Sequence, residues 1–105
     1  MTDILDRLED TIRSRRGQPE ADSASYTAQL FARGRARIAQ KLGEEAIETV
    51  IAACGDDSAK IVPEAADLLY HLLVLLADAG LSLNDVRAEL ARREGRGGLE
   101  EKARR

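Results

Sequence analysis

Two acidic stretches set the pattern of this chain, and they read Lys41-Leu42-Gly43-Glu44-Glu45-Ala46-Ile47-Glu48 and, after fifteen intervening residues, Glu64-Ala65-Ala66-Asp67. Each stretch holds two acids that are three residues apart, Glu45 with Glu48 and Glu64 with Asp67. Residues at this spacing share one face of an α-helix, so each stretch stacks two carboxylates on adjacent turns. Two such helices packed side by side would form a group of oxygen ligands suited to Mg²⁺ or Mn²⁺.

Helical signals continue on both sides of these stretches, and we predict five helices. Asp3 is a capping residue for the first helix, and Pro63 fits the first turn of the fourth. Gly34, Gly55 and Gly80 mark breaks between helices. The predicted ranges are about Ile4 to Arg15, Ser25 to Ala32, Arg35 to Cys54, Val62 to Ala79, and a fifth helix capped by Ser82 that ends near Glu94. The fold class is therefore all-α, because no segment has the period-two alternation of a strand.

The predicted fourth helix is apolar around most of its circumference, which is typical of a central helix. Its polar residues form one narrow stripe and are Glu64, Asp67, His71 and Asp78. This stripe has to face a cavity, a partner or a neighbouring subunit, since buried charges need partners or metal. On the third helix an apolar arc runs from Ile38 through Val50, and Glu45 falls at its border with the acidic side.

Size and charge narrow the class of protein. The 105 residues suit one domain, which we place at residues 1–94 and follow with a charged flexible tail at 95–105. A net charge of −3 argues against nucleic-acid binding, and no apolar run approaches the ~18 residues of a membrane span. The first residues lack the apolar run of a signal peptide, and the single Cys54 excludes an internal disulfide. We expect a cytoplasmic protein with neither nucleic acid nor membrane as partner.

Each candidate site also has a purely structural interpretation. The acids of the third helix could be a solvated face in which Lys41 pairs with Glu45 one turn later. That interpretation fails for Glu64 and Asp67, because they head an otherwise apolar helix. For His71 we predict a structural role, or a hydrogen bond that orients a carboxylate, rather than metal ligation.

A basic group precedes the acids and consists of Arg33, Arg35, Arg37 and Lys41. Cations so close to a metal site suit phosphate oxygens, which makes Arg33 and Lys41 candidate substrate contacts. A solvated basic face is an equally good interpretation of Arg35 and Arg37, whereas Lys41 lies one turn ahead of Glu44 on its stripe. Gly43 inside a helix costs about 1 kcal/mol relative to Ala, which predicts the close approach of another helix.

These residues together give the chain a resemblance to a known family. The Glu-x-x-Glu and Glu-x-x-Asp pattern resembles that of the all-α nucleoside triphosphate pyrophosphohydrolases related to MazG. Three further stretches narrow the resemblance to the phosphoribosyl-ATP pyrophosphohydrolases of histidine biosynthesis, and they read Ser25-Tyr26-Thr27-Ala28-Gln29-Leu30-Phe31, Lys41-Leu42-Gly43-Glu44-Glu45 and Asp67-Leu68-Leu69-Tyr70-His71-Leu72-Leu73-Val74-Leu75-Leu76. The similarity covers about Ile4 to Arg93.

The resemblance implies a fold, a reaction and a partner. The fold is a MazG-like bundle of about four to five helices, completed by dimerisation, and residues 1–94 form the pyrophosphohydrolase domain. The reaction is the Mg²⁺-dependent hydrolysis of N1-(5-phosphoribosyl)-ATP to N1-(5-phosphoribosyl)-AMP and pyrophosphate, the second step of histidine biosynthesis. The expected partners are this small-molecule substrate and a second copy of the chain.

Carried over residue by residue, the resemblance also implies site residues. The expected metal ligands are Glu45, Glu48, Glu64 and Asp67. Glu44 is expected to be a further ligand or the catalytic base, a role for which Glu48 is the other candidate. Lys41 is expected to bind phosphate and stabilise the charge that builds on it. Three residues are expected near the substrate, and they are Ser25, Tyr26 and Thr27.

Two alternatives stay open. The same metal site would serve a housekeeping enzyme of the MazG type that hydrolyses abnormal nucleoside triphosphates. The other alternative is a non-catalytic helical dimerisation module whose acids are only solvated faces. That module predicts that Glu64→Gln and Asp67→Asn are harmless, whereas a catalytic role predicts that turnover is lost while the fold is retained.

Overall fold

The structure is a computed structural model that describes residues 2–17 and 25–94. These ranges hold five α-helices and one 3₁₀ turn, which are α1 (Ile4–Arg15), α2 (Tyr26–Arg33), α3 (Arg35–Ala53), η2 (Ser58–Lys60), α4 (Ile61–Asp78) and α5 (Leu83–Glu94). No strand occurs within them, so the predicted all-α class is confirmed. The tail predicted at 95–105 lies outside the described residues.

Local capping explains why the predicted helix bounds agree with the observed ones to within one residue. Asp3 and Asp6 form a reciprocal capping box at the start of α1, each side chain accepting from the other residue's backbone N–H. Ser25 caps α2 from outside the helix instead of forming its first turn. Ser82 and Asp85 form a second reciprocal pair at the start of α5, in which each side chain accepts from the other residue's backbone N–H.

The end of α4 is a Schellman motif at Gly80, whose φ of 76° suits a residue without a Cβ. The N–H of Leu81 donates to the carbonyl of Leu76 at 2.8 Å, and the N–H of Gly80 donates to the carbonyl of Ala77 at 3.1 Å.

No single described helix is long and apolar enough to cross a membrane. The segment Ser58–Asp78 and α5 meet that criterion only as a pair bent by 106°, on length and composition alone.

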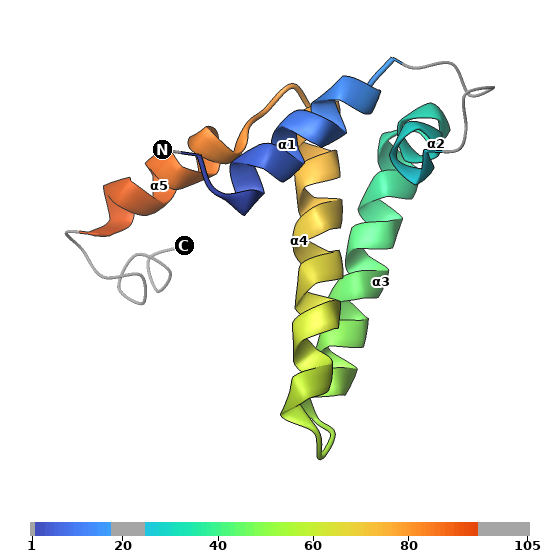
Figure 1. Cartoon of the computed structure of the whole chain (residues 1–105), viewed down its shortest axis with the longest axis vertical. Coiled ribbons are helices and arrows are strands. Elements are labelled where there is room, and N and C mark those ends of the chain that lie inside the picture. Colours follow the sequence, from blue (N-terminus) through green and yellow to red (C-terminus); the bar gives the residue numbers. More distant parts are fainter. Residues whose placement is uncertain (1, 18–24, 95–105) are drawn as a thin grey trace.

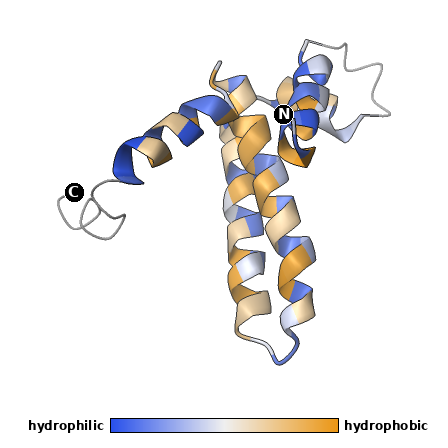
Figure 2. Ribbon diagram, turned by 60° about the vertical axis from the view of Figure 1, so that its left-hand side comes forward, coloured by the Kyte–Doolittle hydropathy of each residue, from blue (hydrophilic) through white to orange (hydrophobic). Residues whose placement is uncertain are grey.

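Helices α3 and α4 form a long hairpin that dominates the molecule (Figure 1). The helices α1 and α2 pack against the end of the hairpin where α3 begins and α4 finishes, and α5 extends away from that end. At the opposite end a short connection, residues 54–60, joins the two long helices and includes η2. Figure 2 shows hydrophobic residues along the whole hairpin, including the end that no other described helix covers.

The apolar core lies at the end where α1 to α4 meet. Its buried residues come from all four helices and are Ile12, Leu30, Ile38, Leu73, Val74 and Ala77. In contrast, none of residues 46–70, which we call the distal half of the hairpin, is buried. The predicted apolar arc of α3 is therefore fully buried at Ile38 but 61% exposed at Val50.

One expectation for α3 is wrong, and so is one detail of the solvated-face interpretation. A Cβ built at Gly43 meets nothing within 4 Å, so no other described helix makes the predicted close approach there. Lys41 forms its ion pair with Glu44 at 3.2 Å and not with Glu45. The second difference matters for the site, because it leaves Glu45 free to face α4.

Candidate metal and phosphate site

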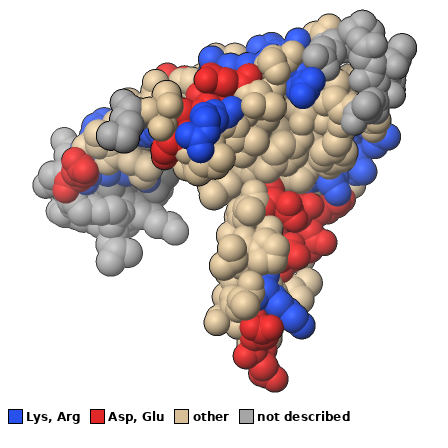
Figure 3. Space-filling model, viewed as in Figure 1, with Lys and Arg blue, Asp and Glu red and all other residues tan. Residues whose placement is uncertain are grey.

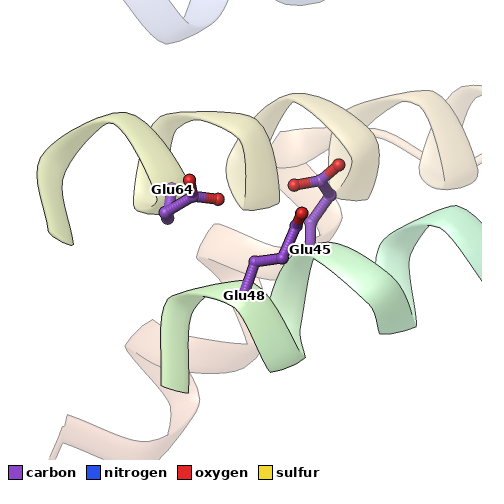
Figure 4. Close-up of side chains that lie close together, drawn as sticks. All are labelled: Glu45, Glu48 and Glu64. Atoms are coloured by element: carbon purple, nitrogen blue, oxygen red, sulfur yellow. The ribbon is translucent and has the colours of Figure 1, made fainter. Parts of the chain in front are cut away.

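The hairpin brings three of the predicted acids together. Glu45 and Glu48 from α3 and Glu64 from α4 each offer a carboxylate oxygen, and these three oxygens lie within 4.8 Å of one another. Figure 3 shows Asp and Glu side chains gathered along one side of the hairpin, and Figure 4 shows the three carboxylates between the two helices. Glu45 is 8% exposed, Glu64 is partly buried and Glu48 is exposed. The group is therefore open to solvent on one side, and a cavity of about 310 Å³ adjoins Glu48 and Glu64.

The three carboxylates carry a surplus of negative charge. Contact with Glu48 raises the pKa of Glu45 to about 7, with burial and the charge of Asp67 as further causes and Lys41 opposing them. Closely spaced carboxylates that share a partly buried site are stabilised by a proton or by a metal cation. Three carboxylate oxygens and no sulfur or imidazole form a donor set that fits Mg²⁺ or Mn²⁺ and not zinc.

Asp67, the fourth predicted ligand, stands beside this group. Its side chain is exposed and is not among the three acids whose oxygens converge. Its charge nevertheless contributes to the raised pKa of Glu45. Its backbone carbonyl accepts a hydrogen bond from Nδ1 of His71 at 2.7 Å. The role of Asp67 as a ligand stays a prediction.

Glu44 faces cations instead of the other acids. Its carboxylate accepts from Nζ of Lys41 at 3.2 Å and from Nε2 of Gln40 at 3.0 Å, and it lies 3.9 Å from the guanidinium of Arg37. The hydrogen bond from Lys41 is the main cause that lowers the pKa of Glu44. The same bond raises the pKa of Lys41, and the charge of Glu45 adds to that effect. Lys41 is thus held as a cation beside the acid group.

The other members of the predicted basic group lie elsewhere. Arg35 forms an ion pair with Asp78 at 2.6 Å, at the far end of α4 from Glu64. Arg33 is exposed at the last position of α2, and no ion pair in the described part of the chain links it to the acids. Of the predicted basic group, Lys41 and Arg37 are therefore the members that lie near the acids, while substrate binding by Arg33 stays a prediction.

Helices α2 and α4 share a cluster of hydrogen-bonded polar side chains that the sequence did not predict. The hydroxyl of Tyr26 lies 3.0 Å from Nε2 of His71, and the hydroxyls of Thr27 and Tyr70 are hydrogen-bonded. The rings of Tyr26 and Tyr70 stack with their centroids 6.2 Å apart. His71 is buried and hydrogen-bonded, as its predicted structural role requires. Of the residues expected near the substrate, Ser25 caps α2, whereas Tyr26 and Thr27 face α4.

Comparison with known proteins shows similarity over nearly the whole chain. Residues 5–94 match the family described as phosphoribosyl-ATP pyrophosphohydrolase. A protein of Rhizorhabdus wittichii named phosphoribosyl-ATP pyrophosphatase is 60% identical over 103 residues, which cover 98% of this chain and 95% of that protein. Proteins of the same name from Parvibaculum lavamentivorans and Azospirillum brasilense are 58% and 57% identical, each over 100 residues that cover 94% of this chain and 89% and 87% of those proteins.

Proposed function

The chain belongs to the phosphoribosyl-ATP pyrophosphohydrolase family, and from this we propose that it hydrolyses N1-(5-phosphoribosyl)-ATP between the α and β phosphorus atoms. The products are N1-(5-phosphoribosyl)-AMP and pyrophosphate, and the reaction is the second step of histidine biosynthesis in the cytoplasm. The observation that carries the proposal is the group of three converging carboxylates next to the Lys41 cation. A triphosphate needs both parts, because its oxygens bind cations and its metal ion needs acidic ligands.

Glu45, Glu48 and Glu64 would hold Mg²⁺, or Mn²⁺ in its place, with Asp67 as a fourth ligand. When bound, such an ion neutralises charge on the triphosphate and acidifies a water molecule. The raised pKa of Glu45 supports this assignment, because its largest cause is the neighbouring carboxylate of Glu48, and the opposing charge of Lys41 does not cancel it.

The side chains around this group have distinct roles in the proposal. Lys41 binds phosphoryl oxygens and stabilises the charge that builds on them, and Glu44 holds its Nζ in place at 3.2 Å. Glu48, one of the three converging acids, takes the proton of the attacking water. Glu44 is the weaker candidate for this base, because the hydrogen bond from Lys41 lowers its pKa.

We also propose that the chain forms a homodimer through the distal half of its hairpin. Large apolar side chains in that half are 45–70% exposed, and they are Ile47, Val50, Ile51, Val62 and Leu69. A cluster of exposed apolar residues on consecutive turns of two helices is typical of a protein interface. A second hairpin packed on this surface would complete a four-helix bundle, the arrangement that the family resemblance suggests.

The test is an assay for pyrophosphate with purified protein and Mg²⁺, using phosphoribosyl-ATP, ATP and dUTP as parallel substrates. Release from phosphoribosyl-ATP alone that EDTA abolishes would support the proposal. Release mainly from ATP or dUTP would instead indicate a housekeeping pyrophosphohydrolase with the same metal site. If a folded sample released no pyrophosphate from any substrate, a non-catalytic helical module would be the better interpretation.

A further inference from the structure

Both ring nitrogens of His71 have a hydrogen-bond partner, and the partners fix where the ring proton lies. His71 is only 4% exposed. Its Nδ1 lies 2.7 Å from the backbone carbonyl oxygen of Asp67, and its Nε2 lies 3.0 Å from the hydroxyl of Tyr26. A carbonyl oxygen can only accept a hydrogen bond, so Nδ1 carries the proton. In the neutral ring Nε2 is then an acceptor, and the Tyr26 hydroxyl donates to it.

This bond leaves the Tyr26 hydroxyl without a proton for any other partner. A phenolic hydroxyl has one proton to donate, and further partners can therefore only donate to its oxygen. The Tyr26 ring is held in place by stacking on Tyr70 and by an edge contact with His71, with ring centroids 6.2 Å and 5.9 Å away. Tyr26 is nevertheless 47% exposed, so a ligand can reach it.

The hydroxyl of Tyr26 borders the phosphate end of the site. The charges of Tyr26, Glu44 and Glu45 all contribute to the raised pKa of Lys41, so the tyrosine and these acids lie near the same cation. On α4, His71 bonds to the carbonyl of Asp67, one turn earlier on the helix. Tyr26 therefore lies on the α2 side of Lys41, whereas Glu48 and Glu64 extend towards the distal half of the hairpin.

We propose that Tyr26 determines substrate orientation by accepting a hydrogen bond from a hydroxyl or amino group of the nucleoside part, and that His71 is the positioning residue that keeps Tyr26 an acceptor. This inference rests on the proposed function. Phosphate oxygens at neutral pH are acceptors, so they gain nothing from a hydroxyl whose proton is already donated. Sugar hydroxyls and amino groups are donors. The triphosphate therefore lies at Lys41 and the acids, and the nucleoside lies towards α2.

The first experiment locates the protons in the whole, tag-free protein without substrate. The chain contains one histidine, so its imidazole signals in a ¹⁵N-resolved NMR spectrum belong to His71 without further assignment. From the hydrogen-bond partners we expect the proton on Nδ1 and an acceptor at Nε2. A proton on Nε2 would overturn the inference, because Tyr26 would then accept from His71.

The second experiment measures steady-state kinetics with phosphoribosyl-ATP. Tyr26→Phe keeps the stacked ring and removes only the hydroxyl. We expect KM to rise about 3–10-fold, as for the loss of one hydrogen bond, with a smaller change in kcat. The inhibition constant of pyrophosphate should stay unchanged, whereas Lys41→Met should weaken pyrophosphate binding. An unchanged KM, or weaker pyrophosphate binding by Tyr26→Phe, would overturn the inference and favour a nucleoside at the cavity beside Glu48 and Glu64.

Variants of His71 test its positioning role. His71→Phe should reproduce the rise in KM of Tyr26→Phe, and His71→Gln, whose amide can still accept from Tyr26, should restore part of the affinity. If His71→Phe does not fold, the Tyr26→Phe result and the NMR spectrum decide the question. A wild-type protein that releases no pyrophosphate from phosphoribosyl-ATP would remove the proposed function and this inference together. An active enzyme with an unchanged KM in Tyr26→Phe would remove only the inference.

Discussion

At the core end of the hairpin Ile38 and Val74 are fully buried, whereas Ile51 and Val62 in the distal half are 66% and 70% exposed. The residue types are the same, and the two pairs lie on the same two helices. The difference arises because α1 and α2 cover the core end, while in the distal half the 3₁₀ turn η2 is the one other described element that packs on α3 and α4. A pair of packed helices buries only the side chains that face each other, so side chains on the outer faces of α3 and α4 stay exposed where no third helix covers them. The core end is thus complete within one chain, and the distal half and its acids are suited to binding something from outside it.

The largest expected effect is a difference in the free energy of unfolding between isoleucine-to-alanine substitutions at the two ends of the hairpin. Ile38→Ala should lower the free energy of unfolding by about 2–5 kcal/mol, because it leaves a cavity in the core. Ile51→Ala, on the same helix, should cost less than about 1 kcal/mol when the chain is monomeric, since Ile51 is 66% exposed. Urea unfolding at low protein concentration measures both values. Equal costs would mean that the distal half is already packed in the monomer.

The next effect concerns the acids. Glu45→Gln and Glu64→Gln should each lower kcat for phosphoribosyl-ATP by at least about 10²-fold, because metal binding contributes several kcal/mol to such reactions. The helical circular dichroism should be retained. Without metal, Glu45→Gln should even raise the melting temperature, since Glu48 and Asp67 no longer face an ionisable neighbour.

A matched control for the acids is available on α5. Glu89 is a partly exposed acid whose carboxylate is bound by Arg92 and Arg93, outside the candidate site. Glu89→Gln should leave kcat unchanged. A comparable loss of activity in Glu89→Gln, or full activity in Glu64→Gln, would contradict the assignment of the site.

A smaller effect is expected on assembly. Ile51→Glu places a charge in the proposed dimer surface and should shift the mass measured by sedimentation equilibrium from dimer towards monomer. Ile4→Glu is a matched control, because Ile4 is 64% exposed but lies on α1 at the core end. Wild-type protein that is monomeric at micromolar concentration, or equal effects of the two variants, would show that the distal half is not the interface.

The smallest effect belongs to the ion pair between α1 and α5. A hydrogen bond from Arg87, at 2.8 Å, is the largest cause that lowers the pKa of Asp6 to about 2 from its usual 3.8. A carboxyl whose pKa is lower in the folded state stabilises the fold above its unfolded pKa, and this contribution is lost as the pH falls through the folded value. The difference in unfolding free energy between wild type and Arg87→Gln should therefore be present at pH 5 and vanish near pH 2. Added salt should shrink the difference at pH 5, because Arg87 is exposed and Asp6 is only partly buried. A difference that persists at pH 2 would point to lost packing by Arg87 instead.

The helix bounds and the convergence of Glu45, Glu48 and Glu64 were predictable because they depend on neighbours in the chain. Asp3 caps α1 by accepting a hydrogen bond from the N–H of Asp6, three residues later in the chain. A Schellman turn at Gly80 needs only the residues just before and after it. The i,i+3 spacing of Glu45 and Glu48 aligns two carboxylates on any helix. An apolar fourth helix with acids at its start then requires those acids to face the helix beside it.

Contacts between residues that lie far apart in the chain were decided by how the helices pack. Tyr26 and His71 are 45 residues apart, and their hydrogen bond depends on where α2 rests against α4. The position of Asp67 outside the three converging acids depends equally on the rotation of α4 about its axis. Periodicity assigns a side chain to a face of its helix, but the distances between side chains on different helices follow from the packing angle and depth of those helices.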